Sequence, residues 1–224
     1  MIKIIYEDNH LLVVEKPINQ LVQADNTKDL DLLTELKMYL KEKYQKPGNV
    51  YLGLVHRLDR PVGGVMVFAK TSKAAARLAK QMQENKMIKE YHAVICGNIK
   101  PDEDILEDYL LKDKETNMVK VDKKGKFARL KYQKKACVDN LSLIHITLDT
   151  GRSHQIRVQF SSRNFPLYGD QRYNKNAKVK EQIALWATKL TLEHPITKES
   201  ISFESTYPNY YPWNLFKETD VTIN

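Results

Sequence analysis

The sequence predicts one domain of the α+β class, residues 1–224, in which helices flank a mostly antiparallel, mixed β-sheet. β-prone segments of strand length recur along most of the chain, separated by turn residues, whereas only a few segments show the apolar spacing of a helix. A length of 224 residues suits one or two domains, and the chain contains no internal repeat and no linker rich in Pro, Gly or Ser. Antiparallel pairing of the strands is the simplest arrangement of these segments.

The N-terminal part is expected to contain two short strands and a helix. Residues 2–6 and 11–17 are β-prone on either side of an Asp8-Asn9 turn. Within residues 29–46, apolar side chains recur every three or four positions, and a Pro-Gly pair follows as a terminator. This spacing predicts an amphipathic helix.

A buried strand and a second helix follow. Residues 65–69 form a continuous apolar run that is too short for a helix, which is typical of a strand buried on both faces. Thr71 and Ser72 carry the hydroxyls that suit a helix N-cap, so the second helix should begin there. Its expected apolar face holds Ala75, Leu78, Ala79 and Met82.

The remaining strands are expected in the second half of the chain. In order, they are residues 90–96, 127–138, 141–148, 183–192 and 200–207. Asp139-Asn140 is a two-residue pair well suited to the tight turn of a hairpin. Residues 112–126 are charged and lack periodicity, so we expect an exposed excursion there.

The charge balance favours a polyanionic partner. Lys and Arg number 36 against 28 Asp and Glu, which gives a net charge of +8, a surplus that suits nucleic acid. No apolar stretch approaches the ~18 residues of a membrane span, and the N-terminus lacks the features of a signal peptide. We therefore expect a cytoplasmic protein with no membrane partner. Eight glycines are few, which argues against a Gly-rich nucleotide-binding loop.

The first segment that suggests chemistry is residues 56–64, His-Arg-Leu-Asp-Arg-Pro-Val-Gly-Gly. Here Asp59 is flanked by arginines and followed by a proline and two glycines, which places a carboxylate on a tight loop of the kind that often carries function. The alternative is an aspartate that caps a turn and pairs with a neighbouring arginine at the surface.

The second segment is residues 150–160, Thr-Gly-Arg-Ser-His-Gln-Ile-Arg-Val-Gln-Phe. Ser153 suits a helix N-cap, and the first turns of that helix would carry His154, Gln155 and Arg157. Donors at a helix N-terminus favour an anion such as an RNA phosphate. The alternative is a basic amphipathic helix that only packs its apolar side.

The third segment is residues 89–95, Lys-Glu-Tyr-His-Ala-Val-Ile, which reads as a strand. Its alternation places Tyr91 on the same face as Ala93 and Ile95. The ring could be a platform that stacks on a base or an ordinary core tyrosine, and the segment alone leaves both open.

Together and in this order, the three segments resemble the motifs of the RluA-type pseudouridine synthases: His-Arg-Leu-Asp, then Lys-x-Tyr, then Gly-Arg-x-His-Gln-Ile-Arg. Further similar tetrapeptides cover almost the whole chain. The resemblance implies the pseudouridine synthase fold and the isomerisation of uridine to pseudouridine in structured RNA, either tRNA or rRNA. It implies no cofactor and no metal, and we expect a monomer.

The resemblance also implies roles for individual residues. Asp59 would be the ionised catalytic carboxylate, Arg157 would hold it ionised, and Tyr91 would retain the loose uracil. The implied RNA-binding residues are His56, Arg57, Arg60, Arg152, His154 and Gln155.

Two features depart from the family pattern. Val62-Gly63-Gly64 stands where many members have Thr-Ser-Gly, so loop hydroxyls are missing but glycine's backbone freedom is retained. Many relatives also carry an N-terminal S4 domain, for which the sequence leaves no room, because the catalytic pattern begins at residue 2. We therefore expect the catalytic domain to recognise its substrate by itself.

Two other classes of protein fit parts of the sequence. A non-catalytic RNA-binding protein would explain the charge, but it would have no use for Asp59, whose negative charge opposes RNA binding. A metal-dependent hydrolase could be built on the histidines and Asp59, but neither a His-x-x-x-His pair nor a second acidic cluster is present, and neither cysteine has a metal-ligand spacing.

Overall fold

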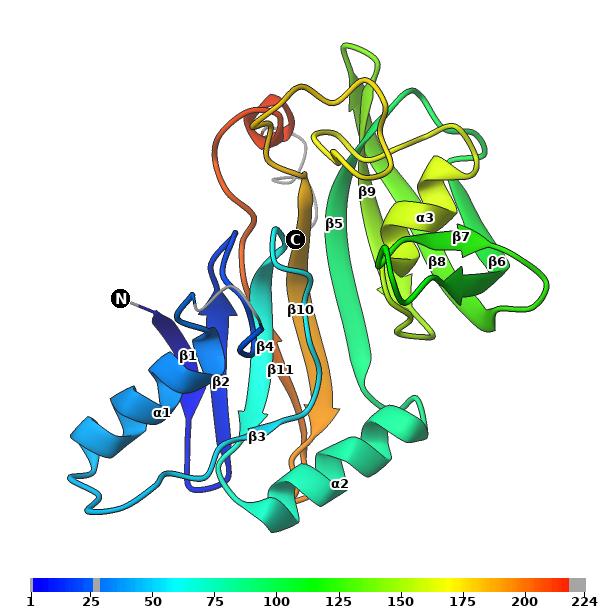
Figure 1. Cartoon of the computed structure of the whole chain (residues 1–224). Helices are drawn as coiled ribbons and strands as arrows, with labels where there is room; N and C mark the ends of the chain where they lie inside the picture. Colours follow the sequence, from blue (N-terminus) through cyan, green and yellow to red (C-terminus); the bar gives the residue numbers. More distant parts are fainter. Residues whose placement is uncertain (1, 26–28, 218–224) are drawn as a thin grey trace. The chain divides into compact units, whose positions relative to one another are not determined.

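The computed structural model describes residues 2–25 and 29–217, which form two compact units (Figure 1). Unit 1 is Met1–Ile88 with Ala187–Thr206, and unit 2 is Lys89–Trp186 with Tyr207–Asn224. Strands paired in antiparallel fashion and flanking helices occur in both, which confirms the α+β class. The assignment of residues 1–224 to one domain stays a prediction.

Unit 1 is built on a small β-sheet whose strands are mostly paired in antiparallel fashion. Its elements are β1 (Lys3–Glu7), β2 (Leu11–Lys16), α1 (Leu32–Lys43), β3 (Gly53–Leu54), β4 (Gly63–Ala69), α2 (Ser72–Gln83), most of β10 (Leu185–Glu193) and β11 (Ser200–Glu204). The strand β2 pairs with β1 on one side and with β4 on the other, and β11 pairs with β10. Every residue of β4 is buried, which confirms the predicted strand with two covered faces.

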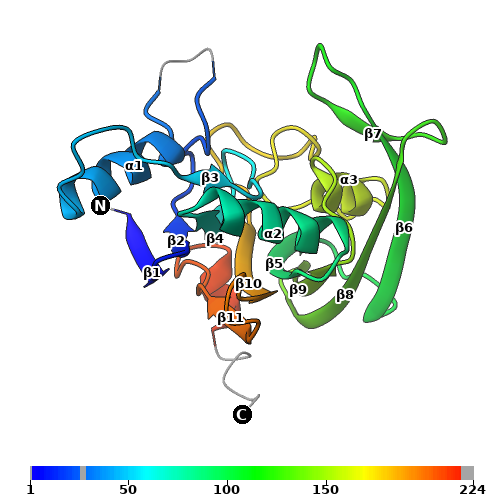
Figure 2. The same ribbon diagram turned by 90° about the horizontal axis from the view of Figure 1, so that it is seen from below.

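The two helices of unit 1 begin at the side-chain caps that the sequence offers. Asp31 accepts a hydrogen bond from the backbone N–H of Thr34 at 3.0 Å, so α1 begins later than residue 29. The hydroxyl of Thr71 accepts from Ala74 N–H at 3.2 Å, which confirms the predicted start of α2. Leucines spaced by four residues bury one side of α1, and α2 packs on β4 (Figure 2).

The predicted apolar face of α2 is wrong at Ala79, which is exposed. The buried residues are Ala74, Leu78 and Gln81. The Gln81 amide donates to the carbonyl of Glu193 at 2.7 Å and accepts from its N–H at 3.0 Å. This polar side chain can be buried because the backbone of β10 satisfies its hydrogen bonds. The buried face of α2 therefore includes Gln81 and leaves Ala79 exposed.

A buried carboxylate joins α1 to the sheet. The side chain of Glu7 is 7% exposed and pairs with Lys43 at 2.7 Å and with Lys70 at 2.8 Å. It also accepts hydrogen bonds from the hydroxyls of Tyr39 and Tyr44. Burial would raise the pKa of Glu7, but these hydrogen bonds outweigh it and lower the pKa from 4.5 to about 2.

Glu7→Gln should therefore lower the free energy of unfolding at pH 7 by about 2 kcal/mol, since the two ammonium groups lose their shared anion. Because the folded pKa lies below the unfolded one, the stabilisation is complete above about pH 4.5 and is lost as the pH falls through about 2. Denaturant unfolding of both proteins at neutral and strongly acid pH measures the difference. Glu84→Gln is the control, because Glu84 pairs with lysines at the surface and its loss should change stability little. Equal effects of the two substitutions would contradict the prediction.

Unit 2 contains the longer strands. Its elements are β5 (Ile88–Cys96), β6 (Glu103–Lys112), β7 (Val119–Val121), β8 (Lys126–Val138), β9 (Leu141–Leu148), α3 (Gln155–Ser161) and the 3-10 helix η1 (Trp213–Phe216). The strand order is β5-β9-β8-β6-β7. At the β8–β9 turn, Asp139 and Asn140 have φ angles of 50° and 60°, as the predicted tight hairpin requires.

The charged excursion at residues 112–126 belongs to a hairpin of β6 and β7, whose strands pair between Leu110 and Val121. The helix α3 lies beside this hairpin (Figure 1). Val158 of α3 is part of a small core with Leu110, Val119 and Ala128. The sequence analysis did not predict β6. Its apolar positions are interrupted by acidic residues, one of which, Asp108, accepts hydrogen bonds from Gln159 and Arg163.

Candidate active site

Asp59 lies in unit 1, on the loop that joins β3 to β4. It is half-buried, and its backbone carbonyl accepts a hydrogen bond from Val62 N–H at 3.0 Å, which closes a tight turn. Gly64 follows with φ of 119°. A Cβ at Gly64 would overlap the backbone of Ala187, so glycine is required where the loop enters β4.

A buried lysine fixes this loop. The Lys16 side chain is fully buried, and its ammonium donates to the carbonyls of Pro17 at 2.9 Å, Arg60 at 3.0 Å and Val62 at 2.7 Å. Burial lowers the pKa of Lys16 to about 7, against the opposing effect of the Asp59 carboxylate. The sequence analysis gave Lys16 no role. The sequence did contain a sign of this role, because a single lysine ends the apolar strand β2 immediately before a proline.

The other residues predicted on this loop differ in their surroundings. Arg60 donates to Asp29 at 2.7 Å and to the Asn19 carbonyl at 3.2 Å. His56 Nε2 accepts from Val67 N–H at 3.2 Å, so that ring braces β4. Arg57 is exposed, and no residue of the described chain bonds to its guanidinium.

Tyr91 lies in unit 2, in the middle of β5 opposite Ile146 of β9. It is 8% exposed, and Tyr91, Ala93 and Ile95 are all buried on alternate positions, as predicted. The strand therefore holds Tyr91 with little of its side chain accessible.

Arg157 lies in unit 2, on α3, and is bound by Asp170. Its Nε donates to Asp170 Oδ2 at 2.8 Å and a terminal nitrogen donates to Oδ1 at 2.7 Å, with both side chains buried. The guanidinium also lies over the Tyr173 ring, 5.2 Å from its centroid. Such a planar, two-pronged contact fixes the orientation of an arginine. The sequence analysis missed Asp170 as the partner of Arg157, because Gly169-Asp170 stood out only as part of the family pattern. The expected contact of Arg157 with Asp59 stays a prediction.

The predicted N-cap at Ser153 is wrong. The cap residue of α3 is His154, which has a left-handed backbone with φ of 51° and makes no side-chain cap bond. Its ring Nδ1 lies 2.7 Å from the Tyr173 hydroxyl, which in turn accepts from Val119 N–H. The helix α3 has seven residues, and the anion site expected at its N-terminus stays a prediction.

The hydrogen bonds of Gln155 explain the backbone conformation of the loop that leads into α3. It is 3% exposed, and its amide oxygen accepts from the Thr150 hydroxyl at 2.8 Å and from Arg152 N–H at 3.0 Å. Its amide nitrogen donates to the Arg129 carbonyl at 3.0 Å. These bonds shape the loop before α3. Arg152 is exposed, and its Nε donates to the Phe127 carbonyl at 2.8 Å, the one side-chain hydrogen bond that it makes to the described residues.

Within residues 2–25 and 29–217, no group of three or more His, Cys, Asp or Glu side chains is placed to hold a metal ion. In the same part of the chain, none of the helices has the length and apolar character needed to cross a bilayer.

A sequence model of the family described as RNA pseudouridylate synthase matches residues 10–162. The chain belongs to this family. The match contains all three segments that carry Asp59, Tyr91 and Arg157. An RNA pseudouridylate synthase isomerises uridine to pseudouridine in RNA, so the chain is an RNA-modifying isomerase and RNA is its substrate.

Curated relatives agree with this family. A protein named ribosomal large subunit pseudouridine synthase D from Zymomonas mobilis is 33% identical over 92% of this chain and 69% of its own length. An RNA pseudouridine synthase of Bacillus subtilis, YhcT, is 32% identical over 92% of this chain and 68% of its own. A ribosomal large subunit pseudouridine synthase C from Buchnera aphidicola is 35% identical, and the chain spans 54% of it.

Solved structures confirm the pseudouridine synthase fold. Human RNA pseudouridylate synthase domain containing 4 has a TM-score of 0.79 at 20% identity and covers 92% of this chain and 88% of its own. Human RNA pseudouridylate synthase domain containing 1 has a TM-score of 0.72, also at 20% identity, and covers 94% and 85%.

Proposed function

We propose that this pseudouridylate synthase modifies a uridine in ribosomal RNA or tRNA, with Asp59 as its catalytic carboxylate. The observation that carries the proposal is the construction of the Asp59 loop, because a fully buried lysine, Lys16, binds the carbonyls of Arg60 and Val62 directly after Asp59 and holds the loop in place. Relatives named for the large ribosomal subunit favour ribosomal RNA. We expect the protein to act in the cytoplasm as a monomer and without a cofactor.

The reaction breaks the N1–C1′ bond of uridine, turns the uracil while it is held, and joins C5 to C1′. The proton lost from C5 is balanced by the one that N1 gains, so atoms and electrons balance without a redox step. Asp59 as an ionised carboxylate could attack the sugar, attack the ring or remove the proton. The cation proposed to favour its ionised form is Arg157, and the surface proposed to retain the free uracil is Tyr91.

A uridine inside a stem or loop must first be extruded, at a cost of a few kcal/mol. We propose that Arg57 occupies the vacated stack or clamps the flipped nucleotide, because it is exposed and unbonded within the described chain. Arg152 and His154 are proposed to contact phosphates and 2′-hydroxyls. We propose that His56, Arg60 and Gln155 act on RNA through the loops that their hydrogen bonds fix.

Tyr91→Phe should lower kcat by about a hundredfold or more while RNA affinity is kept, because we expect the hydroxyl to handle the C5 proton in addition to the ring's stacking. Single-turnover pseudouridine formation and a binding titration on the same RNA measure the two effects. Retention of most activity would show that the ring only stacks. A thermal unfolding curve serves as the control, because a large loss of stability would identify the hydroxyl as a structural group instead.

Pseudouridine mapping of total RNA from cells with and without the gene tests the proposed substrate. We expect a site in ribosomal RNA or tRNA to lose its pseudouridine and to regain it on expression of the wild-type protein, but not of Asp59→Asn. An unchanged map would contradict the proposal.

A further inference from the structure

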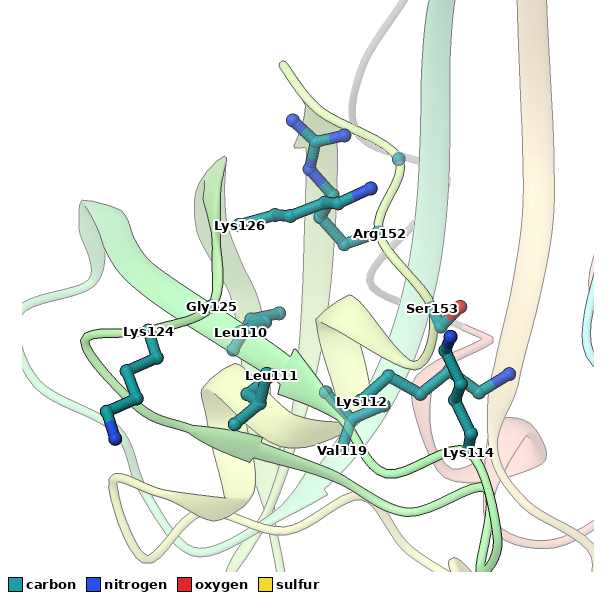
Figure 3. Close-up of a pocket in the computed structure, with 11 residues that line it drawn as sticks. Leu110, Leu111, Lys112, Lys114, Val119, Lys124, Gly125, Lys126, Arg152 and Ser153 are labelled. Atoms are coloured by element: carbon teal, nitrogen blue, oxygen red, sulfur yellow. The ribbon is translucent and has the colours of Figure 1, made fainter.

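A basic pocket in unit 2 lies between the β6–β7 hairpin and the loop that precedes α3 (Figure 3). It encloses about 440 Å³. Its lining residues are Leu110, Leu111, Lys112, Lys114, Val119, Lys124, Gly125, Lys126, Gly151, Arg152 and Ser153. Leu110 and Val119 are buried, so the floor of the pocket belongs to the small core below α3.

The cations of this pocket lack anionic partners. Within the described residues, no carboxylate pairs with the side chains of Lys112, Lys114, Lys124, Lys126 or Arg152. The nearby acids are engaged elsewhere. Asp113 accepts from the backbone N–H of Glu115 at 2.8 Å, and Asp122 accepts from Lys124 N–H at 3.0 Å and pairs with Lys120 at 3.1 Å.

Four of the cations form two pairs. Figure 3 shows Lys126 beside Arg152 at one end of the pocket, while the ammonium groups of Lys112 and Lys114 approach each other near Ser153. Lys124 points away from both pairs. Two clusters of like charge, each without a carboxylate, favour a ligand with more than one negative charge.

A further cation adds to this positive field. The ammonium of Lys89 would lie 3.0 Å from a Cβ at Gly151, a residue of the pocket wall. Burial and the nearby Arg152 guanidinium both lower the pKa of Lys89. A bound anion would relieve this repulsion.

We propose that this pocket binds the sugar–phosphate backbone of the RNA substrate, so that Lys112 and Lys114 hold one phosphate and Lys126 and Arg152 hold another. The proposal rests on the proposed function, because it extends the RNA contact from Arg152 to three lysines of the β6–β7 region. The bases are not the ligand. The exposed aromatic pair of this region, Tyr109 and Phe127, is not part of the pocket lining, so the pocket offers no aromatic ring on which a base could stack.

The test uses a short single-stranded RNA made only of adenosine and cytidine, so that binding does not depend on a uridine or on catalysis. For the wild-type protein we expect the slope of log K against log salt to be about −3 to −4. Lys112→Gln/Lys114→Gln should flatten that slope by ~0.7, the value for the one phosphate that this pair holds, and raise Kd about tenfold at low salt.

Lys131→Gln/Lys175→Gln is the matched control, because it removes the same charge from exposed positions of unit 2 outside the pocket. Its slope and Kd should stay close to wild type. Equal changes in the two double variants, or no change in either, would overturn the proposal. Thermal unfolding verifies that both fold.

Inorganic pyrophosphate carries the same phosphate groups as the RNA backbone, so it tests whether the pocket binds a small anion instead of RNA. If it binds the wild-type protein tightly while both double variants bind the RNA equally well, the pocket takes a small anion and the proposal fails. A separate assay of pseudouridine formation by the wild-type protein distinguishes this failure from a failure of the proposed function.

Discussion

Asp59→Asn should abolish pseudouridine formation while RNA binding stays intact or becomes slightly tighter. The substitution removes the proposed catalytic anion but no cation, and an anion near RNA weakens binding. Stability should barely change, because Asp59 is half-buried and the loop around it is held through the backbone carbonyls that Lys16 binds. Single-turnover kinetics, filter binding and thermal unfolding of the same preparation measure the three effects.

Asp139→Asn is the matched control for Asp59→Asn. It removes one negative charge by the same change of side chain, at a turn where asparagine tolerates the left-handed backbone. It should keep full activity. Residual turnover of Asp59→Asn within about tenfold of wild type corresponds to a barrier change of only ~1.4 kcal/mol, which is too small for an essential carboxylate.

Features that depend on local chemistry could be predicted from the sequence. The hydroxyl of Thr71 caps α2, the Asp139-Asn140 pair turns the hairpin, and Tyr91 alternates with buried neighbours along β5. Each of these depends on residues within a few positions, whose spacing the sequence displays directly.

Features that depend on contacts between distant segments could not be predicted. The partner of Arg157 is Asp170, the brace of the Asp59 loop is Lys16, and Gln81 is buried because the backbone of Glu193 satisfies it. In each case a polar side chain can be buried because a group from a distant segment forms hydrogen bonds with it. The spacing of apolar residues in the sequence gives no sign of that group. The charged strand β6 was missed for a related reason, since its acidic residues are partnered from α3 and the residues that follow it.

The wrong cap at Ser153 shows how a local rule fails when a tertiary contact is stronger. A serine before a helix normally caps it, but Gln155 accepts the N–H of Arg152 and anchors to the Arg129 carbonyl. The chain therefore enters α3 through His154 in the left-handed region. As a result, His154 stands at the cap position, whereas Gln155 and Arg157 lie on α3 as predicted.

Arg157→Lys should lower kcat about a hundredfold although the positive charge is kept. An ammonium cannot reproduce the two parallel hydrogen bonds to Asp170 or lie flat over the Tyr173 ring, so the cation would shift, and a small displacement in an active site has an effect of this size. Single-turnover rates of the wild-type protein and the variant on the same RNA measure the effect.

Arg163→Lys is the control for Arg157→Lys, because Arg163 contacts Asp108 through one terminal nitrogen at 2.8 Å and is partly exposed, so an ammonium can replace it. It should keep near-normal activity. Asp170→Asn should resemble Arg157→Lys in its rate loss, since it weakens the same two-pronged contact from the other side. Near-normal activity of Arg157→Lys would mean that the residue supplies only long-range charge, and the partner of Asp59 would then have to be another cation.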